Sequence, residues 1–286
     1  MKRFIIAARD RVRLSDFDPR DTGSFRSKDD ARKKLQQDIE TLAELQDKLY
    51  AQARHGVLVI LQGIDTAGKD GAIKHVMTGI NAAGVTVYSF KEPSSEEQRH
   101  DYLWRAHKVV PPRGRISIFN RSYYEDVVVT RVHPELLGQF AEEARARGDD
   151  FWEQRFSDIM AFERYLSHNG IAILKFFLHI SKEEQKKRLL KRIDDPSKHW
   201  KFSAADLQER SYWDRYVSAY EQMLSHTSET TAPWYVIPAD RKWFARMAIA
   251  DIIVERLKRI DPQYPKIAPA LERELQLAKA AIVAET

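Results

Sequence analysis

The stretch VLVILQGIDTAGKDGAIKH, from Val57 to His75, constrains the fold of this chain more than any other. It opens with an apolar run of strand length, and the pattern G-x-x-x-x-G-K follows directly as Gly63, Gly68 and Lys69. The segment after the lysine places apolar residues at helical spacing. A strand, a glycine-rich loop and a helix in this order form a phosphate-binding loop, where backbone N–H groups converge on phosphate. We therefore predict a phosphate loop, with a glycine-rich turn that binds nothing as the alternative.

Four further runs of β-branched and aromatic residues have strand length, and helical segments separate them. They are VTVYSF from Val85, ISIFN from Ile116, IAILKFFLHI from Ile171 and WYVIPA from Trp234. Near-continuous apolar strands of this kind are typical of a parallel sheet that is covered on both faces. The sequence therefore predicts an α/β fold, a three-layer α/β/α sandwich with a five-stranded parallel sheet of the P-loop kinase type.

The segments outside these strands suggest how the chain is divided. An amphipathic helix is expected from Lys28 to near Gly56, and a last helix from Trp243 to about Ile260. The residues before the first helix carry scattered charges and read as irregular. The predicted parts are an N-terminal arm at 1–27, a P-loop kinase domain at 28–265 with a helical lid at about 182–215, and a C-terminal tail at 266–286.

Composition excludes several classes of function. The 286 residues include no cysteine, which rules out disulfides, cysteine-bound zinc and thiol catalysis. The apolar runs are too short for a signal peptide or a membrane span. Forty-seven Lys and Arg against 42 Asp and Glu leave a net charge of +5, enough to steer an anionic ligand. We expect a cytoplasmic protein without a membrane partner.

Two acidic residues in the predicted phosphate loop indicate a metal site. Asp70 stands where such loops usually carry Ser or Thr, and Asp65 lies inside the loop. Carboxylates beside phosphate repel it unless a cation lies between, so we expect both to hold Mg²⁺, for which Mn²⁺ can substitute. Asn120, at the end of the third strand, is a third oxygen ligand. An N-cap role for Asp70 is the alternative.

The segment that follows Asn120 places further chemistry at the same edge of the sheet. Arg121 and Glu125 come directly after the strand, where ligands bind in open α/β folds. An ion pair between Arg121 and Glu125 or Asp126 is the structural alternative. Lys91 leaves the second strand toward this edge as well. The phosphate-binding positions expected in the loop are Gly63, Ala67, Gly68, Lys69 and Gly71.

A basic segment follows the fourth strand. Between Lys182 and Lys201 there are eight Lys or Arg and four acids. A helix is expected there with Leu189, Leu190 and Ile193 on its apolar side. A solvated basic face would explain such a run, but in P-loop kinases this position holds a lid that closes cations over the transferring phosphates.

Five motifs taken together resemble the type-2 polyphosphate kinase family, a thymidylate-kinase-like group of P-loop proteins. The motifs are GIDTAGKDG, FNRSYYEDV, SKEEQKKRL, DDPSKHWKF and APWYVIPADRKWF, and the resemblance runs from about Leu14 to Pro265. It implies a Mg²⁺ requirement and reversible phosphoryl transfer between inorganic polyphosphate and nucleoside mono- or diphosphates (AMP or ADP, and GMP or GDP). Asn120 followed by YED resembles subgroups that accept monophosphates, or both mono- and diphosphates. It also implies a homo-oligomer, a dimer or tetramer.

The resemblance implies a role for individual residues. Asp65, Asp70 and Asn120 would line the metal site, and Lys69 would contact the transferring phosphate. Arg121 and Arg131 would stabilise charge, and Glu125 would position metal or acceptor. The lid side of the polyphosphate channel would be formed by Arg188, Arg192, Lys198 and Lys201.

Two rival functions share these features. An ATP-dependent nucleoside monophosphate kinase has the same sheet, loop and lid, but it ordinarily keeps Ser or Thr where this chain has Asp70. A P-loop module that binds polyanions without turnover is the second. A nucleic-acid partner is not expected, because the positive charge clusters near the predicted site rather than over a broad face.

Overall fold

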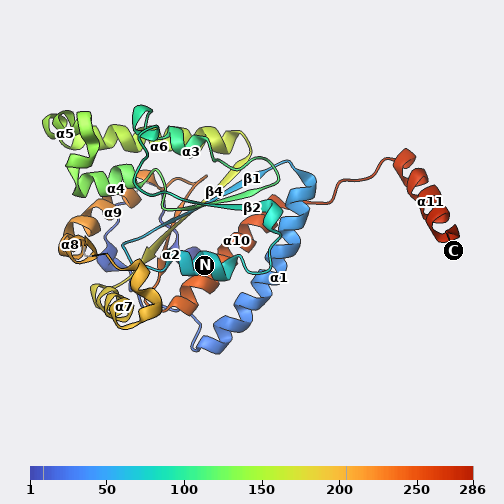
Figure 1. Ribbon diagram of the computed structural model, residues 1–286, viewed down its shortest axis with the longest axis horizontal. Helices are drawn as coiled ribbons and strands as arrows, with labels where there is room; N and C mark the ends of the chain where they lie inside the picture. Colours follow the sequence, from blue (N-terminus) through green and yellow to red (C-terminus); the bar gives the residue numbers. More distant parts are fainter. Residues whose placement is uncertain (9, 204, 286) are drawn as a thin grey trace.

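The five expected strands form one sheet in which all neighbours are parallel. The structure is a computed structural model that describes residues 1–8, 10–203 and 205–285. The strand order is β2-β3-β1-β4-β5. The strands are β1 (Gly56–Gln62), β2 (Val85–Ser89), β3 (Ile116–Asn120), β4 (Ile171–His179) and β5 (Trp234–Pro238). The predicted α/β class and parallel sheet are therefore confirmed (Figure 1).

Helices cover both faces of the sheet and complete the three layers. One face is covered by α1 (Lys28–Gln52), α2 (Lys69–Val76) and α10 (Lys242–Ile260), and the other by α4 (Glu125–Val132), α6 (Asp149–His168) and α9 (Trp213–Thr227). Alternate residues of β1 point to opposite faces. Val57, Val59 and Leu61 join the first core, whereas Leu58 and Ile60 join the second. Such two-sided burial is what a continuous apolar strand predicts.

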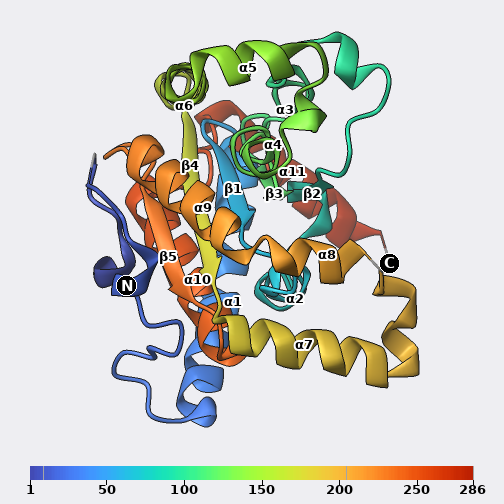
Figure 2. The same ribbon diagram turned by 90° about the vertical axis from the view of Figure 1, so that its left-hand side faces the viewer.

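The lid expected at about 182–215 corresponds to a helical excursion between β4 and α9. It comprises α7 (Lys182–Asp194), the 3-10 helix η6 (Pro196–Lys201) and α8 (Ala205–Ser211). The Ser181 hydroxyl accepts a hydrogen bond from the Glu184 N–H, which caps the start of α7. In Figure 2, α7 and α8 lie on either side of α2, the helix that follows the phosphate loop.

The remaining short elements connect the layers. They are η1 (Lys2–Phe4), η2 (Leu14–Asp16), η3 (Ala82–Gly84), η4 (Glu97–Arg99), α3 (Trp104–His107), η5 (Pro134–Phe140) and α5 (Ala141–Arg147). The arm predicted to be irregular has little regular structure, but it packs against the domain. Phe4, Ile6, Val12 and Leu14 are buried, and the Ile6 N–H donates to the Trp234 carbonyl at 2.9 Å.

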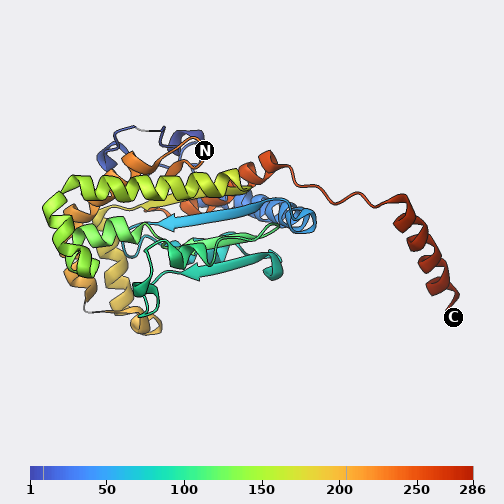
Figure 3. The ribbon, with the colours of Figure 1, turned by 90° about the horizontal axis from the view of Figure 1, so that it is seen from above.

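The C-terminal tail contains a helix that the sequence analysis did not anticipate. This helix, α11 (Pro269–Ala284), has no buried residue. Figure 3 shows it standing away from the body of the molecule at the end of an extended linker. Among the described residues, no helix has the length and apolar character needed to cross a membrane.

Because α11 buries nothing against the domain, ending the chain after Pro265 is expected to change its unfolding free energy by less than about 0.5 kcal/mol. That corresponds to roughly 2 °C or less in the midpoint of thermal unfolding. Ile253→Ala, which removes a fully buried side chain of α10, is the contrast and is expected to cost about 2–5 kcal/mol. A truncation as damaging as Ile253→Ala would show that α11 belongs to the folded core.

Candidate active site

The phosphate loop joins β1 to α2 through a backbone that requires glycine at two points. Gly63 has φ +153°, and a Cβ there would lie 2.8 Å from the Leu178 carbonyl oxygen of β4. Gly68 has φ +108° and stands at the N-cap of α2. Ala67, within the loop, is buried. The loop therefore packs closely against β4, and α2 begins directly after Gly68, as phosphate binding requires.

Lys69 is folded back into this loop. Its ammonium donates a hydrogen bond to the Gly63 carbonyl at 2.7 Å, and only 7% of the residue is exposed. Burial lowers the pKa of Lys69 to about 8, and the positive charge of Arg121 acts in the same direction. Anionic phosphate in the loop would offset both effects.

Asp70 and Asn120, two of the three predicted metal ligands, lie side by side. The Asn120 amide donates a hydrogen bond to the Asp70 carboxylate at 2.7 Å. The pairing of β1 with β3 explains this contact, since Leu61 is aligned with Asn120 and the phosphate loop begins just beyond it. The alternative N-cap role for Asp70 is wrong, because Gly68 stands at the N-cap of α2 without a side-chain cap and Asp70 lies in the first turn.

Asp65, the third predicted ligand, faces the lid. Its Oδ2 atom lies 3.3 Å from a guanidinium nitrogen of Arg192 and is buried without a hydrogen-bond partner among the described residues. No group of three or more His, Cys, Asp or Glu in the described chain could cage a metal alone. The donors are instead a few oxygens beside a phosphate loop, which suits Mg²⁺ because it is usually bound by one or two carboxylates plus substrate phosphates.

Arg121, in the turn after β3, and Glu125, at the start of α4, line a wide cleft. Arg121 is in the left-handed region with φ +63°, and its Nε lies 4.0 Å from Glu125 Oε2. The ion pair considered from the sequence is therefore present at long range. Both residues line a cleft of about 1750 Å³, together with Gly63 and Asp65. A polar, charged cleft of this size next to a phosphate loop can hold a nucleotide-sized ligand.

The far wall of the cleft carries two arginines that the sequence analysis missed. Arg105 donates to the Lys91 carbonyl at 2.9 Å and lies 3.5 Å from Asp126. The guanidinium of Arg155 lies 4.7 Å from the ring centroid of Tyr102, and its Nη1 donates to the Asp126 carbonyl. The predicted Lys91 also lines this cleft. The missed arginines sit within helical sequence among acids, so they resembled ordinary surface charge.

Arg131 is held at the opposite end of α4 from Glu125. It donates to the Asp149 carboxylate at 2.7 Å and lies over the Trp152 ring at 5.4 Å. The structure therefore places this predicted charge-stabilising residue in an ion pair with the start of α6.

Arg188 is the lid residue whose position differs most from expectation. It is 8% exposed and donates to four backbone carbonyls, those of Thr66, Ala67, Ala239 and Asp240. The Glu184 carboxylate accepts from its Nε at 2.8 Å. Arg188 thus ties the phosphate loop to the segment after β5.

The expected apolar side of α7 is only partly correct. Leu189 is buried, but Leu190 and Ile193 are 49% and 43% exposed. Gln185 and Arg188 are buried beside Leu189 instead. The carbonyl acceptors around Arg188 make its burial favourable, and they cannot be read from helical periodicity.

The other predicted lid residues lie at the end of α7 and in η6. Arg192 donates to Asp206 at 2.7 Å, which links α7 to α8, while it also faces Asp65. Lys198 pairs with Asp195 within η6. The side chain of Lys201 lies outside the described part of the structure.

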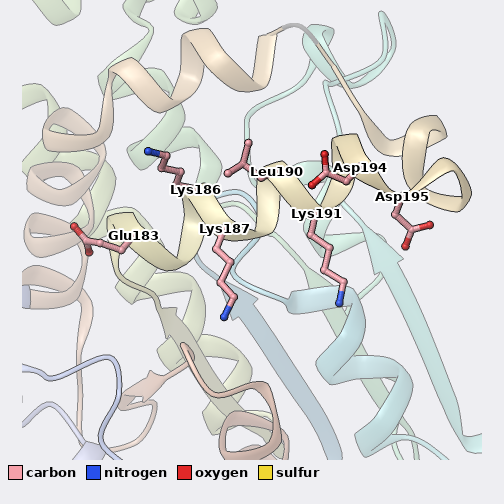
Figure 4. Close-up of a pocket in the computed structure, with 7 residues that line it drawn as sticks. All are labelled: Glu183, Lys186, Lys187, Leu190, Lys191, Asp194 and Asp195. Carbon is pink, nitrogen blue, oxygen red and sulfur yellow. The ribbon is translucent and has the colours of Figure 1, made fainter.

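A second group of cations was missed and lies where α10 begins. Partial burial lowers the pKa of Lys242, and the nearby positive charges of Arg188, Arg246 and Lys191 lower it further. The Arg246 guanidinium is 3.5 Å from the place a Cβ of Gly71 would occupy. Lys187 and Lys191 project from one side of α7, whereas Lys186 projects from a different side of the helix (Figure 4). The motif ADRKWFAR could have indicated these cations from the sequence, because it follows the fifth strand, and ligands bind at the carboxyl ends of parallel strands.

The comparison with known families decides the assignment. The polyphosphate kinase 2 (PPK2) family model matches residues 25–265. The chain belongs to the polyphosphate kinase 2 family. The resemblance drawn from the five motifs is thereby confirmed.

Two relatives of this polyphosphate kinase 2 protein match over nearly their whole length. An ADP-polyphosphate phosphotransferase of Rhodopseudomonas palustris is 46% identical, over 96% of this chain and 95% of that protein. An AMP/ADP-polyphosphate phosphotransferase of Meiothermus ruber is 45% identical, over 96% and 98%. The crystal structure of polyphosphate kinase 2 from Arthrobacter aurescens superposes with a TM-score of 0.85 at 41% identity, covering 93% of each chain.

Asp126, a partly buried acid of the cleft, predicts a pH-dependent stability. Burial raises the pKa of the Asp126 carboxyl from 3.8 to about 6, against the opposing charges of Arg105 and Arg155. The folded protein therefore binds this proton more tightly than the unfolded chain, and its stability falls as pH rises from about 4 to 6. Asp126→Asn should remove this loss. The difference in unfolding free energy between the variant and wild type should therefore change in favour of the variant by up to about 3 kcal/mol across that window, and stay constant above it.

Urea unfolding of both proteins at several pH values between 4 and 8 measures this difference. The exposed Asp150→Asn on α6 serves as the matched control, for which the gap should not change. An Asp126→Asn gap that is the same at every pH would show that the pKa of Asp126 is not raised in the folded protein.

Proposed function

We propose that this protein reversibly transfers a phosphoryl group between inorganic polyphosphate and nucleoside mono- or diphosphates. AMP and ADP are the proposed acceptors, with GMP and GDP as further ones, and Mg²⁺ is the proposed cofactor, replaceable by Mn²⁺. The observation that carries the proposal is the position of the phosphate loop. It lies between a cleft wide enough for a nucleotide and a row of cations on α7 and α10 suited to a longer polyanion.

The family relationship supports the choice of donor and acceptor. The relatives from Rhodopseudomonas palustris and Meiothermus ruber are named as ADP- and AMP/ADP-polyphosphate phosphotransferases. Their sequence identity to this chain extends over the loop, the cleft and the lid alike, since it covers 96% of the chain in both cases. Phosphoryl transfer depends mainly on positioning and charge stabilisation, so a match that spans all three parts of the site supports the same reaction.

The residues of the loop and the turn after β3 fit distinct tasks. Lys69 would move its ammonium from the Gly63 carbonyl to the transferring phosphate, and Arg121 would stabilise charge on its oxygens. Glu125 would position the acceptor or metal. Asp65, Asp70 and Asn120 would hold Mg²⁺, which when bound neutralises phosphate charge and orients the reacting groups. Arg131 remains a proposed contributor, although Asp149 engages it in this structure.

The polyphosphate chain is proposed to run from the loop between α7 and the start of α10. Arg192, Lys198 and Lys201 would contribute from the lid, with Lys242 and Arg246 on the facing helix. Arg188 would act mainly by holding the loop backbone, because its guanidinium is occupied by four carbonyls. Gly63, Ala67, Gly68, Gly71 and Lys91 would shape the phosphate path itself.

An ATP-dependent nucleoside monophosphate kinase is the second candidate. The shared sheet and loop favour it equally, but the doubly acidic loop and the α10 cations favour polyphosphate. We further propose that the protein is cytoplasmic and works without nucleic acid or membrane, as a homo-oligomer of two or four subunits. Sedimentation of the purified chain tests the oligomer, and a monomer at all concentrations would contradict it.

A direct assay tests the function. Purified protein with polyphosphate, Mg²⁺ and AMP or ADP should form the next higher nucleotide, and ATP as donor to AMP should be slower. Lys69→Ala should lower turnover by roughly 10³-fold because it removes the cation nearest the phosphate. Its circular dichroism should stay unchanged, since the Lys69 side chain bonds within its own loop. No nucleotide product from the wild-type protein, or wild-type turnover by Lys69→Ala, would refute the proposal.

The path of the polyanion makes a separate prediction. Arg246→Ala should raise the apparent KM for polyphosphate by at least about tenfold and leave that for nucleotide unchanged, since one charged hydrogen bond is worth about 1.5–3 kcal/mol. Lys186→Ala, which removes a cation from a different side of α7, is the control and should change neither value. Equal effects of the two variants would place the polyphosphate elsewhere.

A further inference from the structure

A buried ion pair lies directly behind the turn that carries Arg121 and Glu125. Lys175 occupies the middle of β4, a strand in the interior of the sheet, and Glu163 occupies α6. Lys175 is fully buried and Glu163 is 3% exposed. The Lys175 ammonium donates to Glu163 Oε2 at 2.6 Å. The mechanism proposed above uses neither residue.

The pair is linked to the turn by two adjacent phenols. The hydroxyls of Tyr123 and Tyr124 both donate to Glu163 Oε1, at 2.9 and 2.7 Å. Lys175 also donates to the Tyr124 hydroxyl at 3.1 Å and to the Thr227 carbonyl at 2.6 Å. The three N–H donors of the ammonium therefore have three acceptors. Burial raises the pKa of both phenols well above the usual value, so they remain hydrogen-bond donors.

The turn is held from the same side at a second point. The Ser122 hydroxyl accepts hydrogen bonds from the buried Gln62 amide and from the Tyr124 N–H, each at 3.2 Å. Residues 122–124 thus face the interior, while Arg121 and Glu125 on either side of them line the cleft. Arg121 keeps its left-handed backbone within this arrangement. A shift of the phenols would therefore displace both cleft residues together.

Stability alone does not account for burying this pair. Removing two charges from water is costly, and apolar residues of similar volume often replace a buried pair without loss of stability. What hydrophobic packing does not supply is a fixed hydrogen-bond geometry at the two phenols. Transfer rates are sensitive to such geometry, because displacements of about 1 Å can lower a rate 10²-fold.

We infer that Glu163 and Lys175 are positioning residues for phosphoryl transfer, which act through the hydroxyls of Tyr123 and Tyr124 to fix Arg121 and Glu125 against the phosphate loop. The inference rests on the proposed function. It assigns no contact between the pair and substrate.

Tyr124→Phe tests the link while keeping the ring in place. It leaves Glu163 bonded to Tyr123 and Lys175, and it should lower kcat about tenfold with little change in KM for polyphosphate. In a Glu125→Gln background the same change should have a much smaller effect, because non-additivity is expected when one residue acts through the other. Tyr235→Phe, on β5 outside the network, should retain wild-type kcat. A wild-type kcat for Tyr124→Phe, or full additivity with Glu125→Gln, would overturn the inference.

A second variant separates position from stability. The double substitution Glu163→Gln with Lys175→Met removes both charges together, so no unpaired charge stays buried. It should unfold within about 5 °C of wild type yet show at least a tenfold lower kcat. A folded double variant with wild-type kcat would overturn the inference. Absence of polyphosphate-dependent transfer by the wild-type protein would instead refute the proposed function, and this inference with it.

Discussion

The parallel pairing of β1 with β3 is the constraint on which the site depends. Leu61 is aligned with Asn120, so the phosphate loop and the turn that begins at Arg121 leave the sheet at the same level. That alignment brings the Asn120 amide within 2.7 Å of the Asp70 carboxylate. The proposed metal site is divided between these two loops and therefore depends on the sheet register that fixes both.

Two buried cations, Arg188 and Lys175, connect the elements around this edge of the sheet. Arg188 ties the phosphate loop to the end of β5 through four carbonyls, and Lys175 ties β4 to α6 and to the end of α9. In both cases the charge is surrounded by acceptors, which is the condition under which a protein tolerates a buried charge. Lys187 and Lys242, by contrast, remain exposed and can contact a polyanion.

The sequence predicts the sheet well because its strands other than the edge strand β2 are largely buried on both faces. The run ISIFN matches β3 residue for residue, and the run from Val57 misses only the first residue of β1. The phosphate loop is also predicted from local sequence, because Gly63, Gly68 and Lys69 follow a strand at the required spacing. Arg188 could not be placed, since its acceptors come from two loops distant in sequence. The buried anchor residues Phe4 and Ile6 were missed because each belongs to a short apolar patch among charges.

The central claim is that the phosphate loop separates a nucleotide subsite from a polyphosphate subsite. A crystal structure of the chain with Mg²⁺, a nonhydrolysable polyphosphate analogue and a nucleoside monophosphate tests it most directly. We expect the nucleotide in the cleft beside Arg121 and Glu125, and the polyphosphate analogue along Lys242 and Arg246. A structure in which the polyphosphate analogue fills the cleft and the cations of α10 contact only solvent would contradict it.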